Sequence, residues 1–354
     1  MPLIYTFPTN FELDVVVQEY MVQHEMFLGE EILPFEEMDS QKVRWDEEDN
    51  ESGMTPPHNM DSEPRIDERP GSKTREYEPI PFKGSELIKE SELLRARELG
   101  TLGGVINLDR YVAKRTRARQ DKTYIRAEWC RWQALCNGEI NINENGVVVR
   151  ETFPIQVYDA LQPWDNHGAA TPLKDANAVD LLFRGTGATA RGAIEYMNKT
   201  TFNHLIENTN DQDIRGFRSQ NFADVTFDLV NINKMLEARG LPMIKVYDDG
   251  YYDRNKLFQT FIPNGKSVVV GKRPMNQKVG AFGMTPTMHR SKNGVPAAGF
   301  FTFVEVNGQS NNGSSVVSTD ALGSAANPNL KITGGVYGGP LFRFGRSVIR
   351  KNLY

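Results

Sequence analysis

The stretch that most constrains the fold is residues 107–137, whose pattern predicts one long α-helix. Asn107 suits the N-cap, Asp109 suits the first turn, and Gly138 follows the last turn. At about 1.5 Å per residue these positions would span roughly 45 Å. Helices in globular domains average three to four turns, so this helix is long for a single domain.

The side chains of this helix, placed at about 100° intervals, form two separate stripes of apolar or small residues. The first stripe holds Tyr111, Ala118, Ile125, Trp129, Trp132 and Cys136, and the second holds Val112, Thr116, Thr123, Ala127, Cys130 and Ala134. Because a helix with two buried stripes contacts two bodies, we expect it to run between them and not to cap one core.

A narrow basic stripe separates the two apolar ones and consists of Arg115, Arg119, Lys122 and Arg126. Four cations at this spacing repel one another, so a compensating partner is expected. Phosphate backbones of nucleic acids bind such stripes without reading sequence. Salt bridges to carboxylates on a neighbouring element explain the stripe equally well, and the residues alone leave both interpretations open.

The net charge of −5 conceals an asymmetry along the chain. Residues 1–80 hold six Lys or Arg against twenty Asp or Glu, residues 81–240 are balanced, and residues 241–354 hold fourteen against five. One interpretation is that both flanks are simply solvated. The other is that the acidic part of one copy docks on the basic part of another, where complementary charge steers association.

Residues 41–82 are acidic and rich in proline, with few large apolar residues between Trp45 and Tyr77. Such a stretch does not build a core of its own. It is read either as a linker or as a long two-stranded arm that lies on another subunit. Pro70-Gly71 marks a turn, and Lys73 to Ile80 alternates loosely, as strands do.

The rest of the chain predicts a mixture of helices and strands. We expect a helix at 10–28, a short helix at 84–99, and a hairpin at 139–158 around Asn145-Gly146. Residues 176–247 are read as a compact α/β domain with strands at 179–183 and 243–246 and helices at 190–207 and 225–239. Two strands flank Pro263-Asn264-Gly265, residues 306–329 form an exposed loop, and strands at 330–337 and 341–353 close the chain.

One segment carries the pattern of a nucleotide site. Gly185-Thr-Gly187-Ala-Thr-Ala190 matches a loose dinucleotide-binding fingerprint, read here as following a strand and preceding a helix. Glycines at such a turn let a pyrophosphate approach the helix N-terminus. A plain glycine-rich turn is the alternative, because no run of βαβ units surrounds the segment.

The remaining reactive side chains form no catalytic or metal-binding motif. The five histidines are scattered, none lies in an H-E-x-x-H pattern, and we read them as surface or packing residues. Cys130 and Cys136 would point in different directions from one helix, so we expect neither a disulfide nor a structural zinc site. No apolar run approaches the roughly 18 residues of a membrane span, and no secretory signal is evident. We therefore assign no catalytic residue, cofactor or metal ligand.

The order of these elements resembles the major capsid protein E family of lambda-like tailed phages, which has the Hong Kong 97 phage capsid fold. Lys42-Val43 matches the start of the family's extended loop, and Glu63 to Phe82 resembles its returning strand. Asn107 to Asn137, with Arg115, Arg117 and Arg119, resembles the spine helix. Further matches are Ile244-Lys-Val-Tyr247, Gly250, Tyr251 and the run from Phe261 to Gly271 in the axial domain, and Pro328 to Tyr354 in the peripheral domain.

The resemblance implies an α+β capsid fold with five parts. They are an N-terminal arm (1–41), an extended loop (42–82), a peripheral domain with the spine helix (83–175), an α/β axial domain (176–270), and returning peripheral strands with the exposed loop (271–354). Inter-subunit contacts are then expected in the extended loop, at Met54, Pro56, Pro57, Pro70, Gly71, Lys73, Arg75 and Tyr77.

The function that the resemblance implies is a major capsid protein that assembles into hexamers and pentamers of an icosahedral head shell. The chain would then reside in the virion and assemble in the host cytoplasm. Its partners would be copies of itself, portal and scaffolding proteins, a decoration protein, and packaged double-stranded DNA contacted without sequence preference. The basic stripe would face this DNA or a scaffold. No membrane is implied. The competing interpretations are an α/β nucleotide-binding enzyme that uses the Gly185 turn and a different phage structural protein, such as a tail component.

Overall fold

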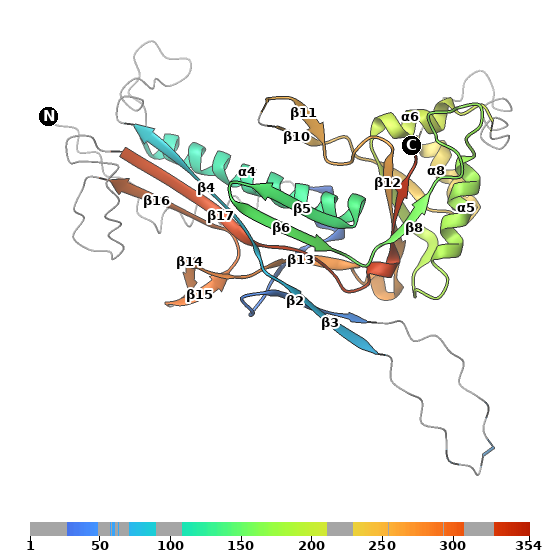
Figure 1. Ribbon diagram of the computed structural model, residues 1–354, viewed down its shortest axis with the longest axis horizontal. Coiled ribbons are helices and arrows are strands. Elements are labelled where there is room, and N and C mark those ends of the chain that lie inside the picture. The colour runs from blue at the N-terminus through green and yellow to red at the C-terminus, as the bar shows by residue number, and fades with distance from the viewer. Residues whose placement is uncertain are drawn as a thin grey trace.

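The computed structural model describes residues 27–48, 57, 59, 60, 63, 71–89, 108–210, 229–253, 255–292, 294–307 and 329–354. The molecule is elongated (Figure 1), with one long helix along a sheet and an α/β lobe at one end. Residues 10–26 of the predicted helix and residues 308–328 of the predicted loop lie outside the described residues.

The long helix α4 runs from Leu108 to Asn137, which confirms the prediction almost to the residue. It contacts strands of both large sheets and the short helix α2 (Leu28–Ile32). Its buried side chains include Val112, Ala127 and Trp132. The helix therefore contacts both sheets, but the first predicted stripe is only partly buried, because Ala118 is exposed while Trp132 and Cys136 are buried.

The first large sheet is built on the longest strand, β17 (Asn329–Phe342). Strand β4 (Ile80–Lys89) pairs antiparallel with residues 329–338 of β17, and β16 (Phe301–Asn307) pairs with residues 329–335. Strand β13 (Gly280–Met284) pairs with the C-terminal end of β17, and β1 (Phe35–Glu37) adds in parallel to β13. This sheet packs against α4.

The second large sheet lies in the α/β lobe and has the strand order β7-β18-β12-β8-β9. Its strands are β7 (Gln156–Asp159), β18 (Val348–Asn352), β12 (Lys266–Lys272), β8 (Thr189–Met197) and β9 (Met243–Val246). The helices α5 (Pro172–Leu182), α6 (Lys199–Glu207) and α8 (Leu229–Ala238) lie in the same lobe (Figure 1). The lobe confirms the predicted α/β character of residues 176–247.

Four two-stranded hairpins complete the described structure, together with the 3₁₀ turns η1 (Pro274–Asn276) and η2 (Gly345–Ser347). The hairpins are β2 (Val43–Glu48) with β3 (Ser72–Tyr77), β5 (Glu139–Glu144) with β6 (Val147–Thr152), β10 (Gly250–Tyr252) with β11 (Phe258–Thr260), and β14 (Pro286–Lys292) with β15 (Val295–Ala298). Asn145 and Gly146 both have positive φ at the β5–β6 turn, as the predicted Asn-Gly hairpin requires.

Four sequence-based assignments are wrong. Residues 338–340, expected to separate the two closing strands, lie inside β17. Residues 84–89 belong to strand β4 and not to a helix. Residues 179–182 lie in helix α5, where a strand was predicted. The predicted helix at 190–207 is strand β8 followed by helix α6, which begins after the N-cap Asn198. The side-chain oxygen of Asn198 accepts a hydrogen bond from the backbone N–H of Thr201 at 2.8 Å, which fixes the start of α6.

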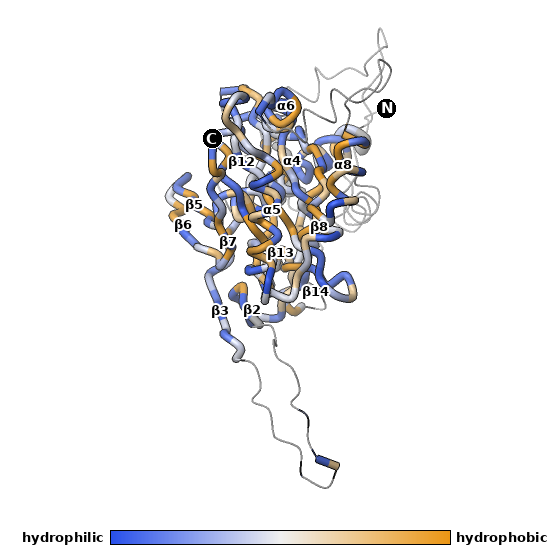
Figure 2. Tube along the Cα trace, turned by 90° about the vertical axis from the view of Figure 1, so that its right-hand side faces the viewer, coloured by the Kyte–Doolittle hydropathy of each residue, from blue (hydrophilic) through white to orange (hydrophobic). Residues whose placement is uncertain are grey.

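The main hydrophobic core lies between α4 and the sheets, and hydrophobic segments gather inside the body (Figure 2). Cys130 and Cys136 are buried in it with free thiols, so the prediction that they form no disulfide is confirmed. Burial raises the pKa of each thiol to about 12. Within the described residues, no helix has both the length and the apolar character needed to cross a membrane.

Candidate assembly surfaces

The β2–β3 hairpin projects from the body (Figures 1 and 2) and is held together by cross-strand polar contacts. Its register pairs Val43 with Tyr77 at the root and Glu48 with Ser72 at the outer end. Arg75 Nε lies 2.8 Å from Glu47 Oε2, and Lys42 Nζ lies 2.8 Å from Glu76 Oε1. The Lys42–Glu76 pair is exposed and contributes little to stability, whereas the Arg75–Glu47 pair is partly buried.

The root of the hairpin is a buried aromatic cluster. Trp45 and Tyr77 pack edge to face at 5.8 Å between ring centroids, and both pack against Phe153. The Tyr77 hydroxyl donates a 2.8 Å hydrogen bond to the backbone oxygen of Pro340. Gly339 makes this possible, because a Cβ there would overlap the Tyr77 hydroxyl. The root therefore fixes the direction in which the hairpin leaves the body.

We expect Tyr77→Phe to destabilise the fold by about 1–3 kcal/mol, because the buried Pro340 oxygen loses its donor. Guanidinium chloride unfolding measures this. Tyr252→Phe is the matched control, since Tyr252 is 74% exposed, and it should leave the unfolding midpoint unchanged. Equal midpoints for both variants would show that the root hydrogen bond does not matter.

The structure locates five of the eight predicted extended-loop residues. Tyr77 is buried at the root, Arg75 is half-buried on β3, and Lys73, Gly71 and Pro57 are exposed. Met54, Pro56 and Pro70 lie outside the described residues. Their predicted contacts with a neighbouring subunit stay a prediction.

Contacts within the chain account for three of the four cations in the predicted basic stripe. Arg115 pairs with Glu86 of β4 at 3.1 Å, and Arg126 pairs with Glu144 at 3.4 Å. Arg119 packs against β4 and β17, where its Nη2 donates to the Gly334 oxygen at 3.4 Å. Burial lowers the pKa of the Arg119 guanidinium from its ordinary value. The salt-bridge interpretation that the sequence left open therefore holds for Arg115 and Arg126.

The solvent face of α4 is basic, but its composition differs from that of the predicted stripe. Lys114, Arg117 and Lys122 are exposed on this face, and only Lys122 belonged to the stripe. Asp121 lies on the same face and is half-buried, which raises its pKa. We call Lys114, Arg117 and Lys122 the helix basic face.

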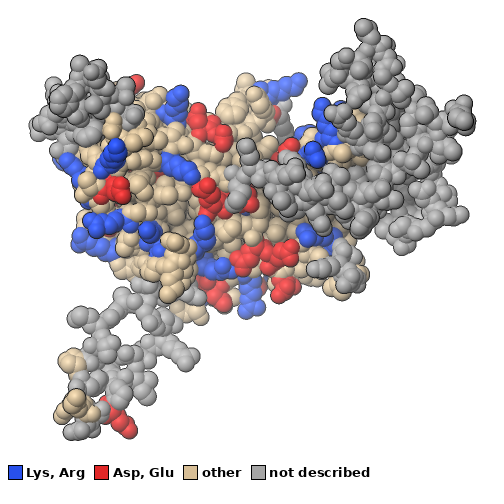
Figure 3. Space-filling view, turned by 180° about the vertical axis from the view of Figure 1, so that it is seen from behind, with Lys and Arg blue, Asp and Glu red and all other residues tan. Residues whose placement is uncertain are grey.

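Ion pairs within one chain join part of the acidic N-terminal region to the basic C-terminal region. The acidic segment at 30–37 lies against basic residues of the C-terminal part, with Lys245–Glu31 at 2.9 Å, Arg343–Glu36 at 2.6 Å and Arg290–Glu37 at 3.7 Å. On the face drawn in Figure 3, acidic and basic side chains are interspersed. Docking between copies stays a prediction for the remaining charges.

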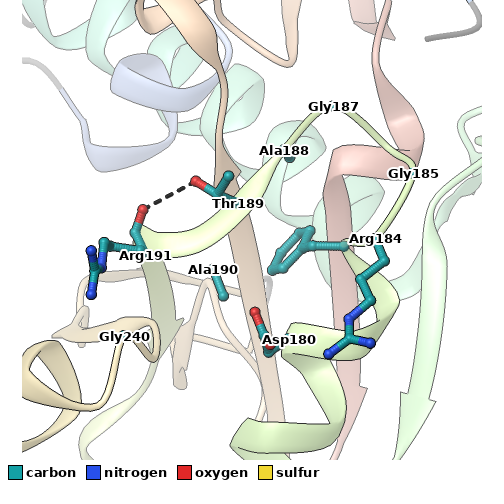
Figure 4. A pocket seen from close by; sticks show the side chains of 10 residues that line it. Asp180, Arg184, Gly185, Gly187, Ala188, Thr189, Ala190, Arg191 and Gly240 are labelled. Atoms are coloured by element: carbon teal, nitrogen blue, oxygen red, sulfur yellow. Dashed lines mark hydrogen bonds between the residues drawn. The ribbon is translucent and has the colours of Figure 1, made fainter. Parts of the chain in front are cut away.

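The Gly185 turn lies in a setting opposite to the one a dinucleotide site requires (Figure 4). It follows the C-terminus of α5 and precedes strand β8. A helix C-terminus carries partial negative charge and presents carbonyl groups, so it repels phosphate. Gly185 and Gly187 have φ of 77° and 73°, which explains the glycines as left-handed turn residues. The hollow beside the turn is lined by side chains of both charges, Asp180 with Arg184 and Arg191. The position and backbone geometry of the segment therefore favour the plain glycine-rich turn over the nucleotide site that the sequence left open.

Sequence reasoning missed one cluster of polar side chains, because its members come from separate segments. His167 Nε2 lies 2.9 Å from His204 Nδ1, although the two residues are 37 positions apart. Glu207 Oε2 lies 3.6 Å from His167 Nε2. The spacing of His204 and Glu207 on α6 could have indicated two of the three members, since residues three apart share a helix face.

The described arrangement defines an elongated α+β subunit, whose rooted hairpin projects beyond its own core. A putative prophage capsid protein from Escherichia coli CFT073 shares this fold, with a TM-score of 0.51, 13% identity and 80% coverage of both chains. A phage-related protein from Bordetella bronchiseptica RB50 matches with a TM-score of 0.52, 11% identity and 96% coverage of both chains. The fold is thus the α+β capsid fold.

The chain belongs to the phage major capsid protein E family, whose model matches residues 12–322. No curated protein sequence matches it.

Proposed function

We propose that this chain is the shell-forming subunit of a tailed-phage head and works by assembling with copies of itself. The observation that carries the proposal is the β2–β3 hairpin, which is fixed at its aromatic root and projects away from the core of its own chain. An arm of this kind gains a packing surface when a neighbouring subunit supplies one. Membership of the capsid protein family and the capsid fold support the same conclusion.

In the proposed shell, subunits form hexamers and pentamers that enclose double-stranded DNA. Each contact between two subunits is expected to bury a modest surface area, about 800 Å² on each partner. Several contacts on each copy make the closed shell far more stable than any pair, because later contacts form at high effective concentration. A closed symmetric shell also leaves few subunit interfaces exposed to solvent. Portal, scaffolding and decoration proteins, and assembly in a host cytoplasm, belong to the same proposal.

The domain boundaries are part of the proposal. The α/β lobe would be the axial domain, α4 the spine helix, and the sheet around β17 with the β5–β6 hairpin the peripheral domain. Contacts of α4 with strands of both large sheets favour this division. The extended loop would begin at β2 and return through β3.

The proposal is tested by the mass of the purified protein, measured by light scattering with and without co-expression of the neighbouring phage genes. Shells, hexamers or pentamers are expected in one of the two preparations. Monomers and dimers alone in both would overturn the proposal.

The helix basic face would contact packaged DNA or a scaffold. Changing Lys114, Arg117 and Lys122 to Gln should leave assembly intact and weaken duplex binding by assembled particles. Each lost phosphate contact should lower the salt slope of binding by about 0.9. Filter binding over a salt series measures this.

The matched control for the helix basic face changes three exposed lysines of the α/β lobe and its neighbouring hairpin to Gln: Lys174, Lys234 and Lys256. The net charge changes equally in the two triple variants, so the control separates local contact from overall charge. Equal loss of binding in the two would contradict the assignment of the helix basic face.

A further inference from the structure

A cluster of two imidazoles and a carboxylate lies at the C-terminal end of α6. His167, His204 and Glu207 each offer one ligand atom, and these atoms all lie within 4.8 Å of one another. His204 and Glu207 come from the last turns of α6, and His167 comes from the segment between β7 and α5. Two imidazole nitrogens and a carboxylate oxygen form a ligand set that proteins use for Zn²⁺.

Two of the three distances between ligand atoms lie close to the value expected around a tetrahedral ion. With metal–ligand distances of about 2.0–2.2 Å, two ligand atoms of a tetrahedral zinc site lie about 3.3 Å apart. The His167–His204 distance of 2.9 Å and the His167–Glu207 distance of 3.6 Å fall on either side of this value. The third distance, between His204 and Glu207, is at most 4.8 Å, so the exposed Glu207 carboxylate would rotate towards His204 to share one ion.

The backbone around His167 is held in place independently of its ring. The His167 oxygen accepts from the backbone N–H of Thr209 at 2.9 Å and from the Thr209 hydroxyl at 3.0 Å. The buried Asn208 side chain donates to the Ala170 oxygen at 3.0 Å. The His204 ring packs edge to face against Tyr354 at 5.1 Å. Both imidazoles are therefore positioned before any ion arrives, which lowers the cost of ordering them.

The cluster is open to solvent on one side. The His167 side chain is 32% exposed and that of Glu207 is 59% exposed. An ion can thus enter from solution, and a water molecule can occupy a fourth position.

We propose that His167, His204 and Glu207 bind one Zn²⁺ ion per chain. The ion takes the place of the hydrogen bond between the two rings and ties the segment before α5 to the end of α6. Because it binds the folded chain, it stabilises the α/β lobe by mass action.

The test is titration of the purified full chain with ZnCl₂, followed by calorimetry and by thermal unfolding. We expect one ion per chain and a higher melting temperature with Zn²⁺. His167→Gln and His204→Gln should each lower the affinity at least tenfold and abolish the thermal shift. His289→Gln is the matched control, since His289 lies in β14 and stacks on Phe301, away from the cluster. The Zn²⁺ affinity of this variant should equal that of the natural chain.

Melting temperatures without metal check that the two variants still fold. Glu207→Gln provides a second variant at an exposed position, where loss of folding is not expected, and it should also lower the affinity. Co²⁺ supplies a further readout, because tetrahedral coordination gives intense visible absorption that the natural chain should show and the histidine variants should lack. Unsaturable binding, one ion per two chains, or equal affinity in the His167 and His289 variants would overturn the proposal.

Discussion

Replacing residues 49–71 by Asn-Gly is expected to give a folded chain that no longer forms shells. Glu48 and Ser72 are directly opposite each other in the β2–β3 register, so a two-residue turn can join them. The replacement keeps the aromatic root with Trp45 and Tyr77 and removes the part of the arm beyond the paired strands. Thermal unfolding should be nearly unchanged, while light scattering should show loss of assembled particles.

A Gly/Ser segment of the same length in place of residues 49–71 is the matched control. It keeps the reach of the arm and removes its side chains, so it separates loss of contact from loss of length. We expect this variant also to assemble poorly if the arm binds a neighbouring subunit through its side chains. Normal shells from the Asn-Gly variant would contradict a role of the arm in assembly.

Glu128→Gln is expected to destabilise the chain by about 3–5 kcal/mol, because it removes the carboxylate paired with the buried Arg131 guanidinium. The Glu30 carboxylate still attracts this cation, but Glu128 is the carboxylate that pairs with it. Glu128 and Arg131 are both fully buried, and Arg131 Nη1 lies 3.3 Å from Glu128 Oε2. Glu128 Oε1 accepts from the backbone N–H of Gly29 at 2.8 Å and from Trp132 Nε1 at 2.7 Å. It also accepts from the Tyr247 hydroxyl at 3.2 Å. One carboxylate thus joins the segment at α2, the long helix and the α/β lobe.

Burial raises the pKa of the Glu128 carboxyl, and the neighbouring Arg131 opposes this shift. The double variant Glu128→Gln with Arg131→Met should therefore recover part of the lost stability, because it removes the unpaired cation. Glu139→Gln is the control, since it breaks the exposed Glu139–Arg150 pair, and it should cost no more than about 1 kcal/mol. Denaturant unfolding of the four chains measures these differences. A Glu128→Gln chain as stable as the control would contradict the account of the buried pair.

The elements that sequence reasoning predicted well are those whose pattern is local. The long helix has caps at both ends and a helical period, and the β5–β6 hairpin has an Asn-Gly turn. Strand β9, in which Ile244 and Val246 are β-branched, was predicted with its observed bounds. In each case the signal lies within the element itself.

The errors occur where tertiary packing overrides local preference. Strand β8 carries Ala, Glu and Met, which favour helices, yet it pairs with both β12 and β9 inside the second sheet. Its conformation is thus decided by neighbours that no local pattern reveals. Helix α5 was read as a strand because Val179–Phe183 is a short apolar run, and such runs do not distinguish a strand from one side of a buried helix.

The residues of the candidate sites also depend on tertiary contacts that no local pattern reveals. The helical period placed Arg115, Arg119, Lys122 and Arg126 on one stripe, but it did not show that β4 and β17 would cover Arg119. The basic side chains that are exposed on α4 therefore include Lys114 and Arg117, which lie outside the predicted stripe. The pairing of His167 with His204 depends on how the segment before α5 packs on α6, which only the fold supplies.

Electron cryomicroscopy of the particles formed by the natural chain, co-expressed with the neighbouring phage genes, tests assembly through the arm most directly. We expect a closed shell in which the β2–β3 arm of each subunit lies across a neighbouring copy, while Trp45, Tyr77 and Phe153 stay packed together at its root. A shell in which the arms contact only their own subunits would contradict this expectation, as would filaments or small soluble oligomers.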